Sequence, residues 1–207
     1  MLTIAGPATG IDGQVIAKGE RVALRALTYA DRPLLQRWAS DPALDYLAGS
    51  EFLRAYQRAS EASVFIDTCL ADPTQVVMIV MPAEGRPEPL GFVRLFNIHR
   101  GERYAFLETI IADRRAVGRG FGIEAGKLIC AWGLDVLGLE RIEAKVYAYN
   151  RLSINALKRN GFRLEGILRR AGFQDGRRCD MLVFGILREE LEAQRQKESN
   201  PERFSFA

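Results

Sequence analysis

Three glycines, each separated from the next by one residue, lie near the middle of this 207-residue chain. Gly118, Gly120 and Gly122 follow an apolar run that is typical of a strand, residues 104–112. They precede a second apolar run, residues 123–134, that is typical of a helix. Glycine allows positive φ angles and close approach of a ligand, and the first N–H groups of a helix have no partner within it. The junction is therefore predicted either to bind an anion such as pyrophosphate or to be a plain flexible turn.

Two common phosphate-binding motifs differ from this loop. A P-loop needs Gly-Lys-Ser or Gly-Lys-Thr, but here Gly122 is followed by Ile123 and Glu124. A dinucleotide-binding fold places Gly-x-Gly-x-x-Gly after its first strand, whereas these glycines alternate and follow more than half of the chain. NTP hydrolysis is therefore not expected, and a pyrophosphate-containing cofactor on a different fold fits the pattern better.

Length and composition are typical of one globular domain with appended ends. Hydrophobic residues make up 48% and charged residues 27% of the chain. The sequence contains no run of about 18 apolar residues that would span a membrane. The formal net charge of +3 is too small to indicate nucleic-acid binding by itself. We therefore expect neither a membrane nor a nucleic acid as a partner.

The cysteines indicate the cellular compartment. Cys69, Cys130 and Cys179 are far apart, odd in number and not accompanied by a histidine cluster. This pattern argues against a disulfide framework and against a zinc site. No secretory signal is recognisable at the N-terminus. We therefore expect a cytoplasmic protein without a metal.

Apolar periodicity and turn residues predict a mixed α/β sheet. The expected strands are residues 22–27, 74–81, 90–98, 104–112, 141–149, 163–170 and 179–186. The expected helices are residues 31–40, 53–70, 123–137, 153–160 and 187–197. The last two strands are expected to form a hairpin around residues 172–176, and the ends, about 1–18 and 198–207, are expected to fray.

Two arginine pairs lie next to the turn of that hairpin, Arg169-Arg170 and Arg177-Arg178. Such pairs are typical of a solvated strand end. They could also meet an acidic substrate or a cofactor phosphate, because the guanidinium group binds carboxylates and phosphates in a bidentate manner. The sequence leaves these alternatives open.

Four segments of the chain carry a resemblance to a known family. The first is residues 19–27, Gly-Glu-Arg-Val-Ala-Leu-Arg-Ala-Leu, with Asp31, and the second is the glycine loop with the Glu-Ala that follows it. The others are Asn150 with Ser153-Ile154-Asn155 and Gly161-Phe162, and the ending within residues 168–187. In this order and spacing they resemble the GCN5-related N-acetyltransferases (GNAT), and within them the RimJ/RimL-like branch.

The resemblance implies a single GNAT-like domain at residues 19–192. Its fold would be a central, mostly antiparallel, twisted sheet with helices on both faces. Residues 1–18 would be an N-terminal extension, and residues 193–207 the end of a helix and a tail. A homodimer is compatible with this reading.

The resemblance also implies acetyl-CoA as cosubstrate, with no metal. Main-chain N–H groups of the loop would hold the pyrophosphate, and the strand before the loop would pair with the pantetheine arm. The implied cofactor contacts are Ile110, Ile111, Gly118, Arg119, Gly120, Phe121, Gly122, Asn150 and Ser153. The loop departs from the family at Val117, where Gln or Arg is usual. Side-chain charge would then come from Arg114, Arg115 or Arg119.

Candidate catalytic residues follow from the same comparison. Glu108 is the one carboxylate in an otherwise apolar strand, so it is the candidate general base; alternatively it faces water or pairs with an arginine such as Arg94. Leu157 stands where many members have a tyrosine that protonates the leaving thiolate. Ser153 is the candidate replacement, or else it is a helix N-cap. His99, the only histidine, is more typical of a solvated loop than of a catalyst.

Three functions are compatible with these residues. The first is transfer of an acetyl group from acetyl-CoA to a primary amine, on a protein N-terminus such as that of a ribosomal protein or on a small molecule. The second is a non-catalytic sensor of acetyl-CoA or CoA, and the third is a scaffold with a vestigial loop. Acceptor specificity is expected in residues 44–58 and 172–178. Asp41, Asp45 and Glu51 could attract a cationic amine there, or be solvated loop charges.

Overall fold

The computed structural model describes residues 3–4, 13–85 and 88–199. Within these residues, nine strands form one sheet in the order β1-β2-β3-β4-β5-β6-β7-β9-β8. The strands are β1 Thr3–Ile4, β2 Val15–Lys18, β3 Val22–Ala26, β4 Val76–Pro82, β5 Gly91–His99, β6 Tyr104–Ile111, β7 Arg141–Tyr147, β8 Arg163–Gln174 and β9 Arg177–Leu187. The helices are the 3-10 helix η1 Tyr29–Asp31 and α1 Arg32–Ala39, α2 Pro42–Ala48, α3 Glu51–Arg58, α4 Ala62–Ala71, α5 Phe121–Leu137, α6 Arg151–Arg159 and α7 Arg188–Ser199.

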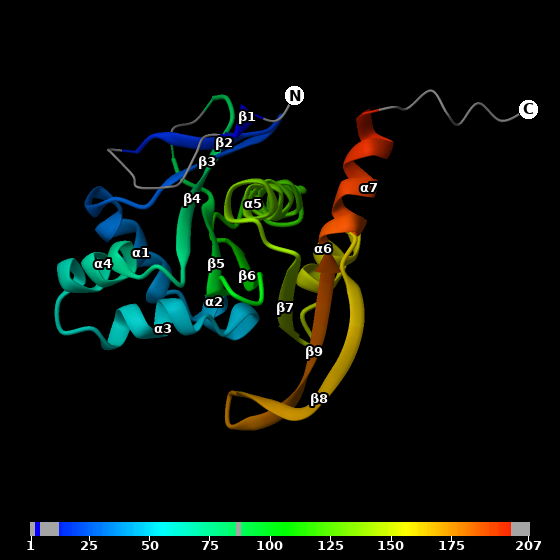
Figure 1. Cartoon of the computed structure of the whole chain (residues 1–207). Helices are drawn as coiled ribbons and strands as arrows, with labels where there is room; N and C mark the ends of the chain where they lie inside the picture. The colour runs from blue at the N-terminus through cyan, green and yellow to red at the C-terminus, as the bar shows by residue number, and fades with distance from the viewer. Residues whose placement is uncertain (1–2, 5–12, 86–87, 200–207) are drawn as a thin grey trace, which may run out of the picture.

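Helices α1–α4 cover one face of the sheet around β4 to β6 (Figure 1). Trp38, Phe52 and Ile66 from these helices are buried in one cluster with Phe92 of β5 and Ile110 of β6. The rings of Phe52 and Phe92 are 5.1 Å apart. This cluster is one half of the core.

Helix α5 covers the opposite face (Figure 1). Leu128 and Trp132 are almost fully buried in a cluster that includes Leu95 of β5, Ile142 of β7 and Phe184 of β9. The predicted α/β architecture, a mostly antiparallel sheet with helices on both faces, is therefore confirmed. No helix in the described part of the chain is long and apolar enough to cross a membrane.

The sheet has one parallel contact, between β6 and β7. It consists of three residue pairs, from Tyr104 with Arg141 to Phe106 with Glu143. Every other neighbouring pair of strands is antiparallel. Beyond Phe106, β6 continues to Ile111 paired with β5 alone, so the sheet divides at this point.

The helix predicted over residues 53–70 is wrong, because the structure has two helices there and a third, α2, before them. Gly49 ends α2 with a left-handed φ of 56°, and the Ser50 side chain caps α3 by accepting a hydrogen bond from the Leu53 N–H at 3.2 Å. After α3 the chain is extended at Ala59. The break allows the Phe65 ring of α4 to pack against Phe52 and Tyr56 of α3. No glycine or proline marks this break in the sequence.

The expectation that the whole of residues 1–18 frays is wrong for its last part. Val15–Lys18 is β2, which pairs antiparallel with β3 and buries Ile16 and Ala17. Residues 1–2 and 5–12 lie outside the described residues, as do residues 200–207 of the other predicted end. Helix α7 continues to Ser199.

The C-terminal hairpin is longer than predicted. Gly172, expected in the turn, pairs with Cys179, and the strands continue to Gln174 and Arg177. Only Asp175 and Gly176 form the turn, with φ angles of 47° and 74°. Positive φ at both turn residues is typical of the two-residue hairpin turn whose twist matches that of the strands.

A methyl group added to Gly91 tests the packing where β5 meets the end of β6. The new Cβ would overlap the carbonyl oxygen of Ile110 and lie 2.9 Å from its carbonyl carbon. Backbone held in a sheet cannot move aside, so Gly91→Ala is expected to lower the free energy of unfolding by about 3 kcal/mol in urea denaturation. The control is Gly166→Ala, where no atom lies within 4 Å of the added methyl. It should change stability by less than about 0.5 kcal/mol, and equal losses in both variants would contradict the prediction.

Candidate active site

The glycine loop connects the end of β6 to the start of α5. Gly118 and Gly120 have φ angles of 77° and 88°, a region that other residues rarely adopt. Gly122 lies in the first turn of α5, where an added Cβ would be 3.2 Å from the Ile111 side chain. Backbone conformation requires two of the glycines, and close packing against β6 requires the third.

The first N–H groups of α5 are available to a ligand. Ile123 and Glu124 both donate to the carbonyl oxygen of Gly120, at 3.1 and 3.2 Å. The N–H groups of Gly120, Phe121 and Gly122 precede these bonds and have no hydrogen-bond partner within the described residues. Together with the positive end of the helix dipole, they form a site suited to a phosphate group.

Arg21 lies over this loop, which the sequence analysis did not foresee. Its backbone N–H donates to the Glu124 carboxylate at 3.0 Å, and its guanidinium carbon is 4.8 Å from the centre of the Phe121 ring. A methyl group on Gly120 would be 2.9 Å from Arg21 Nη1. Arg21 comes from the turn between β2 and β3, so only the tertiary structure brings it to the loop.

Two of the arginines proposed to compensate for Val117 are already paired. Arg114 binds Asp41 at 3.2 Å, and Arg115 binds Asp113 at 3.0 Å. Arg119 has no ion pair within the described residues. Side-chain charge at the loop therefore comes from Arg119 and Arg21 more readily than from Arg114 or Arg115.

Ile110 and Ile111 lie where β6 has no partner on the side of β7. Ile110 is buried among the helices α1–α4, and Ile111 packs against the cluster around α5. In the part of the chain that the structure describes, β7 pairs with β6 no farther than Phe106. Backbone groups on the open side of this segment can therefore pair with an extended ligand, as a further strand would.

Glu108 forms an ion pair with Arg94, directly across from it on β5. The side chains are 17% and 10% exposed, respectively. The Arg94 guanidinium also lies over the Phe96 and Phe52 rings, at 4.1 and 5.1 Å from their centres. Glu108 therefore pairs with an arginine rather than facing water alone. A role for Glu108 as general base stays a prediction.

Asn150, not Ser153, is the N-cap of α6. The Asn150 side-chain oxygen accepts a hydrogen bond from the Ser153 N–H at 3.1 Å, and its nitrogen donates to the Leu47 carbonyl at 2.7 Å. The interpretation of Ser153 as the cap is therefore wrong. The Ser153 hydroxyl makes no hydrogen bond within the described residues, so it is available to a ligand. Leu157, which stands where the family resemblance would place a thiolate-protonating tyrosine, is buried in the core.

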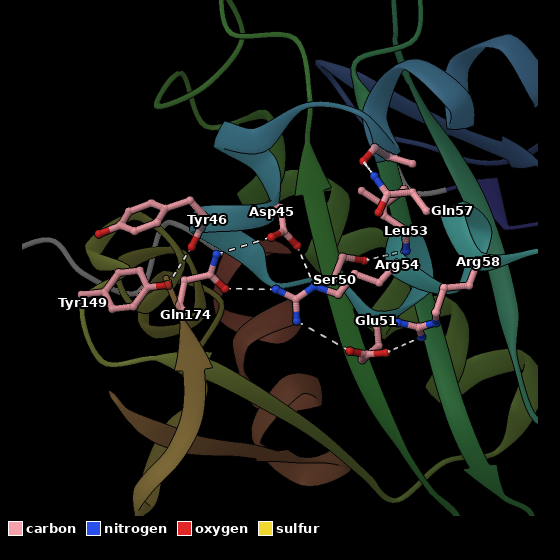
Figure 2. Close-up of polar contacts among 11 residues, drawn as sticks. Asp45, Tyr46, Ser50, Glu51, Leu53, Arg54, Gln57, Arg58, Tyr149 and Gln174 are labelled. Carbon is pink, nitrogen blue, oxygen red and sulfur yellow. Dashed lines mark hydrogen bonds and ion pairs between the residues drawn. The ribbon is translucent and has the colours of Figure 1, made fainter. Parts of the chain in front are cut away.

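Three stacked tyrosines, which the sequence analysis missed, come from the end of β7, from the residues just after it and from α2. Tyr147 and Tyr46 each stack on Tyr149, with ring centres 5.2 and 5.3 Å away. The Tyr149 hydroxyl donates to the Tyr46 carbonyl at 2.6 Å (Figure 2). Burial, together with the neighbouring Tyr147, raises the pKa of Tyr149 above its usual range. Tyr149 therefore stays protonated and remains a hydrogen-bond donor at neutral pH.

A polar network joins helices α2 and α3 to the tip of the hairpin (Figure 2). Arg54 binds the Asp45 carboxylate at 2.6 Å and the Gln174 side-chain oxygen at 3.0 Å. The Gln174 nitrogen donates to Asp45 at 3.4 Å. The Arg54 hydrogen bond lowers the pKa of Asp45, so the network keeps its charges well into the acidic range.

The acidic residues considered for binding a cationic amine all have arginine partners. Asp41 binds Arg114, and Asp45 binds Arg54. Glu51 binds Arg58 at 3.0 Å and also lies 3.6 Å from Arg54. Each of these carboxylates therefore has an arginine partner, and Glu51, which is 66% exposed, is also solvated.

His99 is the last residue of β5, next to the turn that leads to β6. Its Nδ1 accepts a hydrogen bond from the Glu102 N–H at 2.9 Å, and its ring stacks on Tyr104 at 5.4 Å. The side chain is exposed, as predicted, but it lies on a strand rather than in a loop. Among the described residues, no group of three His, Cys, Asp or Glu side chains is arranged to hold a metal ion.

Comparison with other sequences agrees with this geometry. Residues 21–163 match the acetyltransferase (GNAT) domain family. The uncharacterized N-acetyltransferase p20 of Bacillus licheniformis is 29% identical over 172 residues, which cover 83% of this chain and 95% of that protein. The alpha/beta-tubulin-N-acetyltransferase 9 of Mus musculus is 29% identical over 155 residues, which cover 70% of this chain and 63% of that protein.

Two solved structures share the fold. RimJ of Mycobacterium smegmatis in complex with CoA-disulfide has a TM-score of 0.71 and 24% identity, covering 87% of this chain and 89% of that one. Spermidine N-acetyltransferase of Vibrio cholerae in complex with CoA and spermine has a TM-score of 0.71 and 21% identity, covering 83% and 98%. With its family domain matched over most of its length, this chain belongs to the GNAT acetyltransferases and is an acyltransferase.

Proposed function

We propose that this enzyme transfers the acetyl group of acetyl-CoA to a primary amine, by direct attack in a ternary complex. The observation that carries the proposal is that the opening between β6 and β7 leads to the N-terminus of α5. An extended pantetheine arm would pair with the backbone of Ile110 and Ile111. The pyrophosphate would meet the unpartnered N–H groups of residues 120–122, with the Arg119 and Arg21 side chains beside it.

Acetyl transfer needs few catalytic groups from the protein, because a thioester is already activated. A C–N bond forms to the amine as the C–S bond breaks, the amine loses a proton and the thiolate gains one. Holding two reactants in the right geometry can contribute about 7 to 11 kcal/mol in favourable cases. Positioning is therefore the main task, and Glu108 and Ser153 are the side chains we propose for testing in proton transfer.

Two further observations support the cellular compartment and the branch of the family that we propose. The three cysteines are free thiols in the structure, which agrees with a reducing cytoplasm. The shared fold with RimJ supports the RimJ/RimL-like branch. The acceptor would be a protein N-terminus or a small amine, and a homodimer stays a prediction.

Loss of the loop conformation should abolish cofactor binding. Acetyl-CoA at 100 times its Kd should stabilise the wild type by about 2.7 kcal/mol and raise Tm by about 5 to 10 °C. Gly120→Ala should lose this shift, because Gly120 has a φ of 88° and an added Cβ would meet Arg21. Gly85→Ala is the matched control, since Gly85 has a φ of 86° with no atom near the added methyl.

Two further results would change the assignment. An equal shift in both glycine variants would mean that the loop does not bind the cofactor. A shift in the wild type without thiol release from any amine would identify a sensor rather than an enzyme.

Glu108→Gln separates a catalytic from a structural carboxylate. It leaves the buried Arg94 without its charged partner, so we expect the free energy of unfolding to fall by about 3 kcal/mol. We expect kcat and its pH profile to change little, because the carboxylate is already engaged with Arg94. Glu51→Gln, at a pair that is 66% exposed on the Glu51 side, should cost less than about 1 kcal/mol. A large loss of kcat without loss of stability would instead assign Glu108 as the base.

Ser153→Ala tests the candidate acid. Because Asn150 caps the helix, this change should leave Tm within about 1 °C, while slower protonation of the thiolate should lower kcat at least about tenfold. Asn150→Ala is the control for capping, and it should cost about 1 to 2 kcal/mol. If Ser153→Ala retains full turnover, the thiolate receives its proton from another donor.

A further inference from the structure

Four arginines on the outer half of the β8–β9 hairpin have no acidic partner. Arg169, Arg170, Arg177 and Arg178 are exposed, and none of them forms an ion pair within the described residues. Most partly buried arginines elsewhere, Arg54 among them, pair with a carboxylate. The outer half of the hairpin therefore carries four unpaired arginines against two carboxylates, Asp175 in the turn and Asp180 on β9, and an anionic partner would be attracted to the excess positive charge.

Apolar side chains lie among these arginines. Ile167, Leu168 and Phe173 are 55%, 41% and 55% exposed. The Arg178 guanidinium lies over the Phe173 ring at 5.2 Å. Such a combination of exposed apolar and arginine side chains is typical of a protein-binding surface. We call the seven residues 167–170, 173, 177 and 178 the arginine face. They surround the outer half of the hairpin on both sides, because Arg178 lies opposite Phe173 and Arg177 lies opposite Gln174.

A break in the ladder shapes the arginine face. The register between β8 and β9 shifts between Leu168 and Gly172, so residues 169–171 bulge out of the pairing. Arg170 has a φ of 55°, and its N–H donates to the Asp180 side chain at 2.8 Å. A shallow hollow lined by residues 167–171 and Asp180 results. Bulges of this kind redirect side chains, and Arg169 and Arg170 both lie within this one.

The arginine face is fixed to the acceptor side of the enzyme. Gln174 at the tip of the hairpin binds Arg54 and Asp45, and a Cβ added to Gly172 would be 2.8 Å from Tyr147. Asp41, Asp45 and Glu51 in this region each have an arginine partner, whereas Asp175 in the hairpin turn has no ion pair within the described residues. A polycation would find no free carboxylate among Asp41, Asp45 and Glu51, whereas an anionic substrate would find unpaired arginines next to the tyrosine stack.

We propose that the acceptor is the N-terminal amine of an acidic polypeptide, whose following residues dock on the arginine face. This rests on the proposed function. Five residue steps separate Leu168 from Phe173, so the face extends for at most about 17 Å, a length that about five extended residues of a peptide can follow. Carboxylates would bind the arginines, in part as bidentate pairs. A second copy of the hairpin, itself basic, would be repelled.

The test compares three peptides that share their first three residues. Positions four to eight carry Asp and Glu in one peptide, Ser in the second and Lys in the third. Thiol release should give a kcat/KM at least about tenfold higher for the acidic peptide than for the serine peptide at low salt. The difference should shrink in 1 M salt, where the Debye length falls to about 3 Å. Equal values for the acidic and serine peptides would overturn the proposal, as would a preference for the lysine peptide or for spermidine.

Charge reversal locates the docking surface. Arg169→Glu with Arg177→Glu takes one arginine from each strand and avoids both the strained Arg170 and the Arg178 that stacks on Phe173. This variant should raise KM for the acidic peptide about tenfold with kcat unchanged. Arg100→Glu with Arg159→Glu, the same change of charge outside the hairpin, should leave KM unaltered. An acidic preference that persists in the hairpin variant would overturn the proposal.

Direct binding separates docking from catalysis. The fluorescence anisotropy of a labelled acidic peptide, measured with the wild type and CoA, does not depend on turnover. If no amine is acetylated but this peptide binds and the hairpin variant does not bind it, docking stands and the proposed reaction fails. If the peptide does not bind, or single-stranded RNA displaces it at lower concentration than unlabelled acidic peptide does, the docking proposal is wrong.

Discussion

Helix α5 packs against both halves of the sheet, and this contact determines where the sheet can divide. One side of the helix meets Leu95 on β5, and the same cluster includes Ile142 on β7. An added methyl on Gly133 would be 2.8 Å from the Leu95 side chain, so the helix and β5 approach closely. Because the helix holds β5 and β7 together from one face, β6 and β7 can separate beyond Phe106 without exposing the core. The same helix begins next to the end of β6, which brings its free N–H groups to the opening.

Local signals made the central part of the fold predictable from the sequence. The strand before the loop, the glycines and the helix after them follow one another in the chain, and each has its own pattern of apolar residues or positive φ. The break between α3 and α4 was not predictable in this way, because its cause is the packing of Phe65 against α3. Strand β2 is only four residues long and is stabilised by pairing with β3. No local pattern in the sequence predicts this pairing.

The candidate site was predictable to a similar extent. The loop residues could be named because their proposed role, binding of the pyrophosphate, depends on main-chain N–H groups. The partners of a side chain depend instead on strand register and tertiary contact. Arg94 could be suggested for Glu108, but only the alignment of β5 with β6 puts them opposite each other. Arg21 and the tyrosine stack come from segments far from the loop in the sequence. Their positions are set by the fold rather than by a motif.

The contacts between the first helices and the C-terminal half have a consequence for how the protein folds. The bond between Arg54 and Gln174 spans 120 residues, and the bond between Asn150 and Leu47 spans 103. Closing such long loops costs chain entropy before the contacts return any free energy. During synthesis, helices α2 and α3 can form early, but their partners on the hairpin emerge only near the end of the chain. The network of Arg54, Asp45 and Gln174 therefore becomes complete last, after the part of the sheet that carries the glycine loop, and a chain that stops before β8 would lack it.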